Sequence, residues 1–278
     1  MRPENRGSSR FRWRGLRPFR VVGTTVLAMI AIVFATPANG GTGTLVARLA
    51  HVVGLGPSAS RNGKPFGGTP AVGALFTLAG GKLGTHFCTA SVIQSPHGDL
   101  LVTAAHCVTG TTGAIAFVPG YDDGQQPYGI WLVSRVFTDQ AWQASASQDD
   151  DVAFLKVSDN DTSTPIEDVT GAEGLGTGLP PALLTRVIGY PNGASEPVVC
   201  QNRARAYTAA QLEFDCGGYP NGTSGGPFLV RIDQATGEGT VMGVIGGYEQ
   251  GGDDPAVSYS AVFGPAVKAL YQHAVAGS

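Results

Sequence analysis

Charged side chains are scarce in this chain of 278 residues, where they make up 14% of the sequence. A typical globular protein has about a quarter, so this chain is poor in the Glu and Lys residues that cover surface helices. It contains instead 41 glycines and 18 prolines. Because these residues form turns, the composition predicts many short strands joined by tight turns.

Signals for metals, cofactors and nucleic acids are also missing. Beyond the N-terminal region the sequence has no glycine-rich phosphate loop and no basic patch with aromatic residues. Its cysteines form no Cys-x-x-Cys pair, and Cys107 beside His106 is too little for a zinc site. Residues 1–20 contribute +6 to a net charge of −3, so the remaining chain carries −9. We therefore expect no metal, no cofactor and no nucleic-acid partner.

The N-terminus has the layout of an export signal. Residues 1–20 hold seven arginines against one acid, and a mostly apolar run, residues 21–35, follows. The small residues Thr36-Pro37-Ala38 come next, so we predict a signal peptide over residues 1–38 and a secreted, extracellular protein. The alternative is a membrane anchor, for which this run is short against the roughly 20 residues of a span. We expect no stable membrane association after cleavage.

The remaining cysteines fit an oxidising compartment. They are Cys88, Cys107, Cys200 and Cys216. An even number in an exported protein predicts two disulfides, and the sequence alone allows three pairings.

The rest of the chain divides into a short segment and one large folded unit. Residues 39–67 are rich in Gly, Ala, Ser and Pro, which predicts a pro-segment or linker with Arg61 and Lys64 as potential processing sites. From residue 68 to 278 short β-like runs alternate with turn residues, as in an all-β barrel or sandwich. Only residues 265–275 have helical spacing. The predicted strands are 72–78, 88–94, 100–103, 115–119, 130–137, 152–157, 184–189, 198–207, 213–216, 228–232, 241–245 and 258–262.

His106 is a candidate general base. An apolar strand ends at two alanines, and the histidine follows next to Cys107. Histidine can take and return a proton near neutral pH, as a base that later acts as an acid must do. The other histidines are interpreted as core or surface residues; they are His51, His86, His97 and His273.

Asp151 is the candidate partner of that histidine. It ends the acidic triplet 149–151 and precedes the apolar run 152–157. A carboxylate at the head of so apolar a strand needs a partner, because burial of an unpaired charge is costly. Asp149 and Asp150 are interpreted as a solvated turn.

Ser224 is the candidate nucleophile. Glycines flank it in the run Asn221-Gly222-Thr223-Ser224-Gly225-Gly226, and they allow a sharp turn and close approach of a substrate. The backbone N–H groups of Gly222 and Ser224 can then point together at an oxyanion.

Together these three segments resemble the chymotrypsin-like (trypsin-fold) serine protease family, and most closely its secreted bacterial members. The matches are TAAHC at residues 103–107, DVAFLKV at 151–157 and GTSGGP at 222–227. Their order is that of the family, and the separations of 45 and 73 residues fit it. The resemblance implies an all-β fold of two six-stranded antiparallel β-barrels, about residues 68–165 and 166–264, with a C-terminal helix at 265–275.

The resemblance also implies roles for these residues. His106 activates Ser224, which attacks the scissile carbonyl and forms an acyl-enzyme, while Asp151 orients the imidazole. The substrate is then a protein or peptide, and we expect the enzyme to be a monomer. A Cys88–Cys107 disulfide, common in the family, would hold the loop of His106, which leaves Cys200 to pair with Cys216.

Three positions depart from the family pattern. Thr223 stands where members activated by proteolysis carry the Asp that binds the new N-terminus. Gly246 stands where a serine hydroxyl often contacts the catalytic Asp, so backbone N–H groups or water must replace it. Gly218 stands where trypsin-like specificity requires an acid. We expect the pocket to be lined by Gly218, Tyr219, Gly247 and Tyr248, with no readable side-chain preference.

Two other functions remain open. The run from Gly222 to Gly226 also fits the G-x-S-x-G elbow of an α/β-hydrolase esterase, with Asp253 or Asp254 and His273 completing its triad. That fold needs a helix directly after the serine, whereas residues 228–231 have the pattern of a strand. The second alternative is a catalytically weak or inactive protease-like binding module.

Overall fold

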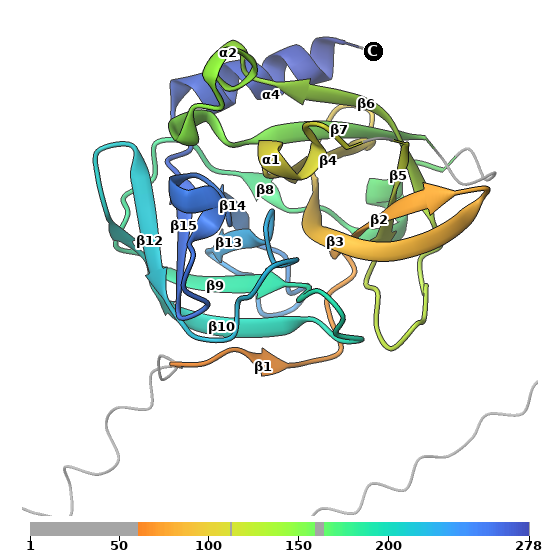
Figure 1. Ribbon diagram of the computed structural model, residues 1–278, viewed down its shortest axis with the longest axis horizontal. Helices are drawn as coiled ribbons and strands as arrows, with labels where there is room; N and C mark the ends of the chain where they lie inside the picture. The colour runs from red at the N-terminus through yellow and green to blue at the C-terminus, as the bar shows by residue number, and fades with distance from the viewer. Residues whose placement is uncertain (1–60, 112, 159–163, 278) are drawn as a thin grey trace, which may run out of the picture. The chain divides into compact units, whose positions relative to one another are not determined.

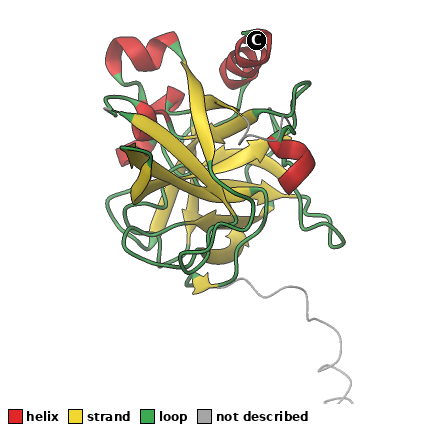
Figure 2. Ribbon diagram, turned by 90° about the vertical axis from the view of Figure 1, so that its right-hand side faces the viewer, coloured by secondary structure: helices red, strands yellow, loops and turns green. Residues whose placement is uncertain are grey.

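Antiparallel strands dominate the described part of the chain, and the helices lie at the outside (Figures 1 and 2). The computed structural model describes residues 61–111, 113–158 and 164–277, all within the unit Leu55–Ser278. The predicted signal peptide, residues 1–38, and most of the predicted pro-segment lie outside the described residues. Among the described residues, no helix is long and apolar enough to cross a membrane.

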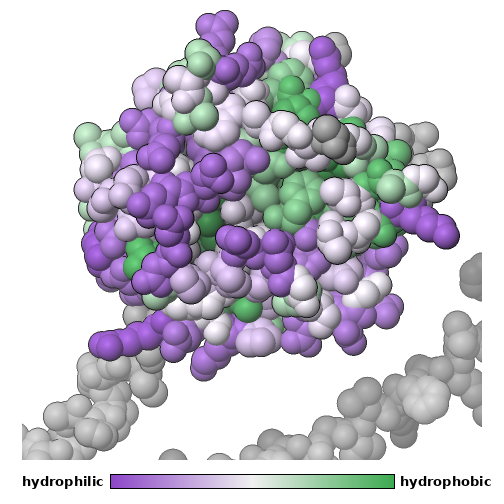
Figure 3. Space-filling view, in the orientation of Figure 1, coloured by the Kyte–Doolittle hydropathy of each residue, from purple (hydrophilic) through white to green (hydrophobic). Residues whose placement is uncertain are grey.

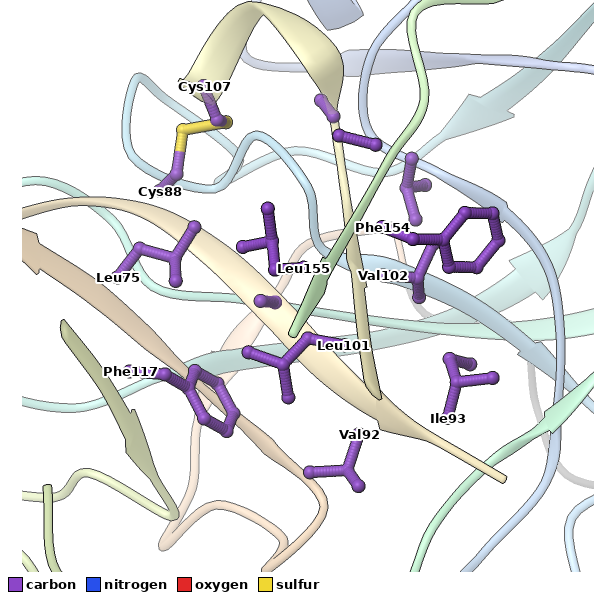
Figure 4. Close-up of a cluster of buried hydrophobic side chains, with 14 of the residues drawn as sticks. Leu75, Cys88, Val92, Ile93, Leu101, Val102, Cys107, Phe117, Phe154 and Leu155 are labelled. Atoms are coloured by element: carbon purple, nitrogen blue, oxygen red, sulfur yellow. A yellow bond between two sulfur atoms is a disulfide. The ribbon is translucent and has the colours of Figure 1, made fainter. Parts of the chain in front are cut away.

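The first six strands after β1 form a closed barrel, in the order β2-β3-β4-β7-β6-β5. The ring closes because β2 pairs with both β3 and β5. The strands are β2 (Val72–Ala79), β3 (Lys82–Ile93), β4 (Leu100–Thr103), β5 (Ala114–Pro119), β6 (Trp131–Thr138) and β7 (Ala153–Ser158). Leucine, valine and phenylalanine side chains fill its interior (Figure 4). Among them, Leu75, Phe117 and Leu155 are fully buried.

The second group of strands divides between two sheets. The larger one has the order β1-β10-β9-β13-β14-β8, and the smaller one β11-β12-β15. Their own core includes Val187, Phe214 and Phe228. The strands are β1 (Lys64–Pro65), β8 (Gly174–Leu175), β9 (Leu184–Gly189), β10 (Val198–Arg203), β11 (Arg205–Ala206), β12 (Gln211–Asp215), β13 (Pro227–Val230), β14 (Thr240–Val244) and β15 (Val257–Ala261).

Short helices connect the strands, and one longer helix ends the chain. They are α1 (Ala105–Val108), α2 (Gln140–Ser145), α3 (Ile166–Thr170) and α4 (Pro265–Ala276), with 3₁₀ turns η1 (Gln148–Asp150) and η2 (Tyr248–Gly251). Helix α4 buries Val267, Leu270 and Ala274. It lies beside β6 and β7 of the first barrel, at the top of Figure 1.

The predicted fold class, all-β with two six-stranded antiparallel β-barrels and a C-terminal helix, is confirmed: six strands close the first barrel, and a second six-stranded sheet with its smaller neighbour forms the other group. Two details differ from the sequence prediction. The strand expected over residues 198–207 is interrupted at the buried Ala204, whose N–H donates to Leu183 O, so β10 and β11 join different sheets. Strand β1 lies within the predicted segment 39–67 and pairs with β10, so ordered structure begins before residue 68.

Both disulfides have the pairing that the resemblance implies. Cys88 is bonded to Cys107, and Cys200 to Cys216. The first joins β3 to α1, and the second joins β10 to the end of β12. Each therefore connects two neighbouring segments of the same strand group, and no free cysteine occurs among the residues that the structure describes.

Candidate active site

A cavity of about 690 Å³ is lined by His106 and Ser224, two of the three predicted catalytic residues. The first barrel contributes Phe87 and Cys88 from β3 and His106 and Cys107 from α1. The second group of strands contributes its loops. These residues are Asn192, Tyr219, Pro220, Asn221, Gly222, Thr223, Ser224, Ile245, Glu249, Gln250, Gly251, Gly252, Asp253 and Pro255. His106 and Ser224 therefore line one cavity from opposite strand groups.

His106 and Asp151 form a hydrogen-bonded pair. The imidazole Nδ1 lies 2.7 Å from Asp151 Oδ2, and the backbone N–H of His106 donates to Oδ1 at 2.9 Å. The Asp151 carboxylate is buried, with 1% of the residue exposed, whereas the imidazole keeps partial access to the cavity. Helix α1, which carries His106, follows β4 after one intervening residue, and the Cys88–Cys107 disulfide connects it to β3.

A third donor completes the surroundings of Asp151. The N–H of Gly247 donates to Oδ2 at 2.9 Å. At Gly246 a Cβ atom would lie 3.0 Å from the same oxygen, so glycine suits the close approach of chain and carboxylate. The serine hydroxyl that is missing at Gly246 is thus replaced by the next backbone amide, one of the two replacements expected from the sequence.

The two acids before Asp151 lie outside the cavity. Asp149 is exposed, as expected for a solvated turn, but its carboxylate accepts a hydrogen bond from the buried Gln211. Asp150 accepts from Ser147 Oγ at 2.6 Å within η1. Only Asp151 reaches the histidine.

Ser224 lies in a tight loop that only glycine permits. Gly222 and Gly225 have φ angles of +97° and +80°, a region that side chains disfavour. A Cβ at Gly225 would lie 2.1 Å from both Thr103 Oγ1 and Thr89 O. The loop passes this close to the first barrel because the Thr89 N–H donates to Ser224 O at 2.7 Å. The serine is therefore held against the barrel that carries His106.

The amides of Gly222 and Ser224 remain available to a ligand. Asn221 O accepts from the N–H of Asn192 at 2.8 Å, so the trans peptide directs the N–H of Gly222 to the opposite side. Within the described ranges neither amide donates a hydrogen bond to the protein. The arrangement offers two backbone donors beside the serine.

Thr223 holds the same loop without a charge. It is buried, with 1% of the residue exposed, and its Oγ1 donates to Pro220 O at 2.7 Å. Its backbone N–H reaches the same oxygen at 3.2 Å. The residue that departs from the family pattern thus closes the turn by local hydrogen bonds.

Comparison with known proteins identifies the family. The family model of the trypsin-like peptidase domain matches residues 84–263. The chain belongs to the trypsin-like peptidase family. This range contains all three candidate catalytic residues and most of both strand groups.

Individual relatives agree with this assignment. A curated protein, trypsin theta of Drosophila erecta, is 35% identical over 111 residues, a region that covers 38% of this chain and 38% of that relative. Among solved structures, the protease Anisep of Arthrobacter nicotinovorans has a TM-score of 0.66 at 22% identity, covering 77% of this chain and 99% of that one. The thermostable serine protease AL20 of an extremophilic microorganism reaches 0.64 at 22% identity, covering 76% and 99%. These structures show the same fold.

The trypsin-like peptidase has an acidic cavity wall. Glu249 and Asp253 line the cavity, and no Lys or Arg does so among the described residues. The chain turns sharply there, because Glu249 and Gln250 both adopt left-handed φ angles of 50° and 54°. In the space-filling view, hydrophilic side chains cover the side of β12 and β15, whereas hydrophobic ones gather over β3, β4 and α1 (Figure 3).

Of the four residues predicted to line the pocket, Tyr219 is part of the cavity lining. Burial raises the pKa of its phenol, which donates to Val187 O at 2.7 Å. Gly218, Gly247 and Tyr248 are not part of the cavity lining. Tyr248 packs instead against Tyr207 and Tyr259, and a hydrogen bond to Glu249 raises its pKa to about 12.

The residues of the esterase alternative do not meet. Strand β13 follows Ser224, where that fold requires a helix. His273 lies on α4 with its ring against Phe137, and it is not part of the cavity lining.

Two positions that contact the nucleophile loop were missed by the sequence analysis. Thr89 and Asn192 reach this loop from β3 and from the loop after β9. Neither belongs to a motif, and both act through contacts far along the chain. Their only sequence signal is that Thr89 follows Cys88.

Proposed function

We propose that this trypsin-like peptidase is a secreted serine endopeptidase with His106, Asp151 and Ser224 as its triad. The observation that carries the proposal is the hydrogen bond from the buried Asp151 to His106, whose imidazole shares one cavity with a serine held between two left-handed glycines. The membership of the family, the two disulfides and the fold of its relatives support the same function.

In this mechanism His106 takes the proton of the Ser224 hydroxyl as Oγ attacks the carbonyl carbon of the scissile bond. Asp151 holds the imidazole with Nδ1–H toward its carboxylate, so that Nε2 faces the serine and accepts the proton. The imidazolium then returns this proton to the leaving amine, and the acyl-enzyme remains. Water, activated by the same histidine, hydrolyses the acyl-enzyme and regenerates the serine.

The negative charge of the tetrahedral intermediate falls on the former carbonyl oxygen. The N–H groups of Gly222 and Ser224 are its proposed donors, because neither donates to any part of the chain that the structure describes. The peptide before Gly222 is oriented by the Asn192 N–H, which supports a hole that needs no newly cut N-terminus. The uncharged Thr223 fits this arrangement, because it could not form an ion pair with a new N-terminus.

The substrate is a protein or peptide, as for the family, and it enters the cavity between the two strand groups. The cavity is proposed as the substrate pocket with Tyr219 as part of its lining. Secretion follows from the predicted signal peptide and from two disulfides, which persist in oxidising compartments. The domain boundaries at residues 38 and 67 and the monomeric state remain predictions from the sequence.

Active-site labelling with a fluorophosphonate tests the proposal. We expect the probe to modify Ser224, and Ser224→Ala to lose both labelling and roughly 10⁶-fold in turnover. His106→Ala should lose labelling, whereas His273→Ala, its matched control, should keep it. Labelling that depends on His273 would support the esterase, and an unlabelled wild-type chain would support the inactive binding module.

A further inference from the structure

The hydroxyl of Thr89 bridges two segments next to the candidate nucleophile. The residue is fully buried on β3, directly after the disulfide-bonded Cys88. Its Oγ1 donates to Gly222 O at 3.1 Å and accepts from the N–H of Tyr190 at 2.9 Å. One hydroxyl of the first barrel therefore connects the loop of Ser224 to the end of β9.

The backbone of Thr89 holds the same loop. Its N–H donates to Ser224 O at 2.7 Å, and its C=O accepts from Thr103 Oγ1 at 2.7 Å. Thr89 therefore contacts both residues whose amides are the proposed oxyanion donors. It does so from the barrel that also carries His106.

The hydrogen bond from the Thr89 hydroxyl to Gly222 O holds the peptide group that follows Gly222. Asn192 already holds the peptide before Gly222 through Asn221 O, and Thr89 holds the peptide after it through Gly222 O. Gly222 has a φ angle of +97° and no side chain to restrict it, so the direction of its N–H depends on these two hydrogen bonds together with the one from Thr223 N–H to Pro220 O.

We propose that Thr89 is a positioning residue for the oxyanion hole. Its hydroxyl keeps the Gly222 amide directed into the cavity. Family members activated by proteolysis use an ion pair of the Asp at position 223 for this purpose, and Thr223 has no charge to form one. This inference rests on the proposed protease function. Loss of one oxyanion donor costs an enzyme about 10²–10³-fold in kcat, so misalignment of a donor that remains present should cost about 10–100-fold.

Thr89→Val tests the inference, because valine keeps the branched shape and removes the hydroxyl. We expect kcat on a chromogenic peptide substrate to fall about 10–100-fold with KM nearly unchanged. Affinity for a peptide aldehyde, whose hemiacetal oxygen occupies the oxyanion hole, should fall in parallel, while affinity for a non-covalent product peptide should not. Thr89→Ser should restore kcat.

Thr185→Val is the matched control. Thr185 is also a fully buried strand threonine, and its hydroxyl donates to Leu183 O at 3.0 Å away from the cavity. If Thr89→Val and Thr185→Val lower kcat equally, or if Thr89→Val leaves kcat and aldehyde affinity unchanged, the inference is wrong. Should Thr89→Val not fold, the smaller Thr89→Ala must show the same selective loss. An unlabelled wild-type chain would instead refute the proposed function itself.

Discussion

The buried carboxyl group of Glu173 should make stability depend on pH. Only 1% of the residue is exposed, and its side chain accepts one backbone hydrogen bond, from Gly239 N–H. Its backbone bonds to Val92 and Gln94, so the residue joins β3 of the first barrel to the second group of strands. Burial raises the pKa of Glu173 from 4.5 to about 7, and the nearby Glu238 adds to the increase.

The size and sign of the effect follow from this shift. An increase of about 2.5 pKa units corresponds to about 3 kcal/mol, at 1.36 kcal/mol per unit. Between pH 4.5 and about 7 the unfolded chain has released a proton that the folded chain still holds. The free energy of unfolding therefore falls as pH rises through this window, by up to about 3 kcal/mol, and the effect is constant above it.

Glu173→Gln removes the titration and keeps an acceptor for Gly239 N–H. Urea unfolding at pH 4.5, 6 and 8, in a Ser224→Ala background that prevents self-digestion, measures the difference between variant and parent. We expect the variant to be more stable than the parent at pH 8, by up to about 3 kcal/mol, and the difference to shrink toward pH 4.5. Glu196→Gln, at an exposed glutamate, should show no such trend.

Parallel curves for Glu173→Gln and its parent would refute the reasoning, because they would mean that Glu173 binds its proton equally in both states. A difference that grows toward acid pH would refute the sign.

Three further outcomes are expected. Replacing Cys88 and Cys107 by serine removes a disulfide that spans 19 residues and should lower the free energy of unfolding in urea by about 3 kcal/mol. Activity should fall as well, because α1, which carries His106, is no longer bonded to β3. Unchanged stability would contradict this. Gly246→Val places a branched side chain where even a Cβ lies 3.0 Å from the Asp151 carboxylate, so kcat should fall at least about 10-fold in steady-state assays, and Gly246→Ala should lower it less; unchanged kcat in the valine variant would contradict this. Because Glu249 and Asp253 both line the cavity, we expect the wild-type chain to prefer Lys or Arg over Glu near the scissile bond in peptide-library profiling. The double variant Glu249→Gln/Asp253→Asn should reduce this preference. A wild-type preference for Glu would contradict the last expectation.

The two carboxylates in the cavity lining would repel an acidic substrate side chain, which is the reason for the last expectation.

The parts of the fold that the sequence predicts are those with local patterns. Apolar runs such as 100–103 and 152–157 form β4 and β7 because their side chains fill the first barrel. The three candidate catalytic residues were found because each lies within a short run of strand and turn residues. Their proximity, with His106 and Ser224 in one cavity and Asp151 bonded to His106, was expected only from the family resemblance, since no local pattern brings together residues 45 and 73 positions apart.

Strand β1 illustrates what local patterns miss. Lys64 and Pro65 have neither alternation nor β propensity, and Pro65 has no N–H for a ladder. They form a strand because β10 offers its free edge, and proline is tolerated at the edge of a sheet. The same segment continues to Gly63, whose N–H donates to Gly217 O just before Tyr219 of the cavity wall.

Three residues that the family pattern places in the substrate pocket, Gly218, Gly247 and Tyr248, are not part of the cavity lining. The left-handed conformations of Glu249 and Gln250 turn the chain, so that Gly247 faces Asp151 while Glu249 and Asp253 face the cavity. Side chains other than glycine and asparagine seldom adopt this conformation, so the turn had no signal in the sequence.

Position 246 shows how far a departure from a family pattern can be interpreted. The missing serine predicted correctly that Asp151 needs another donor, because a buried carboxylate must be satisfied. Which donor it is depends on the path of the chain after Gly246. Because Gly246 has no side chain, the backbone comes close enough for the Gly247 N–H to donate to Asp151 Oδ2 at 2.9 Å. The glycine that removes the serine hydroxyl therefore also allows the amide that replaces it.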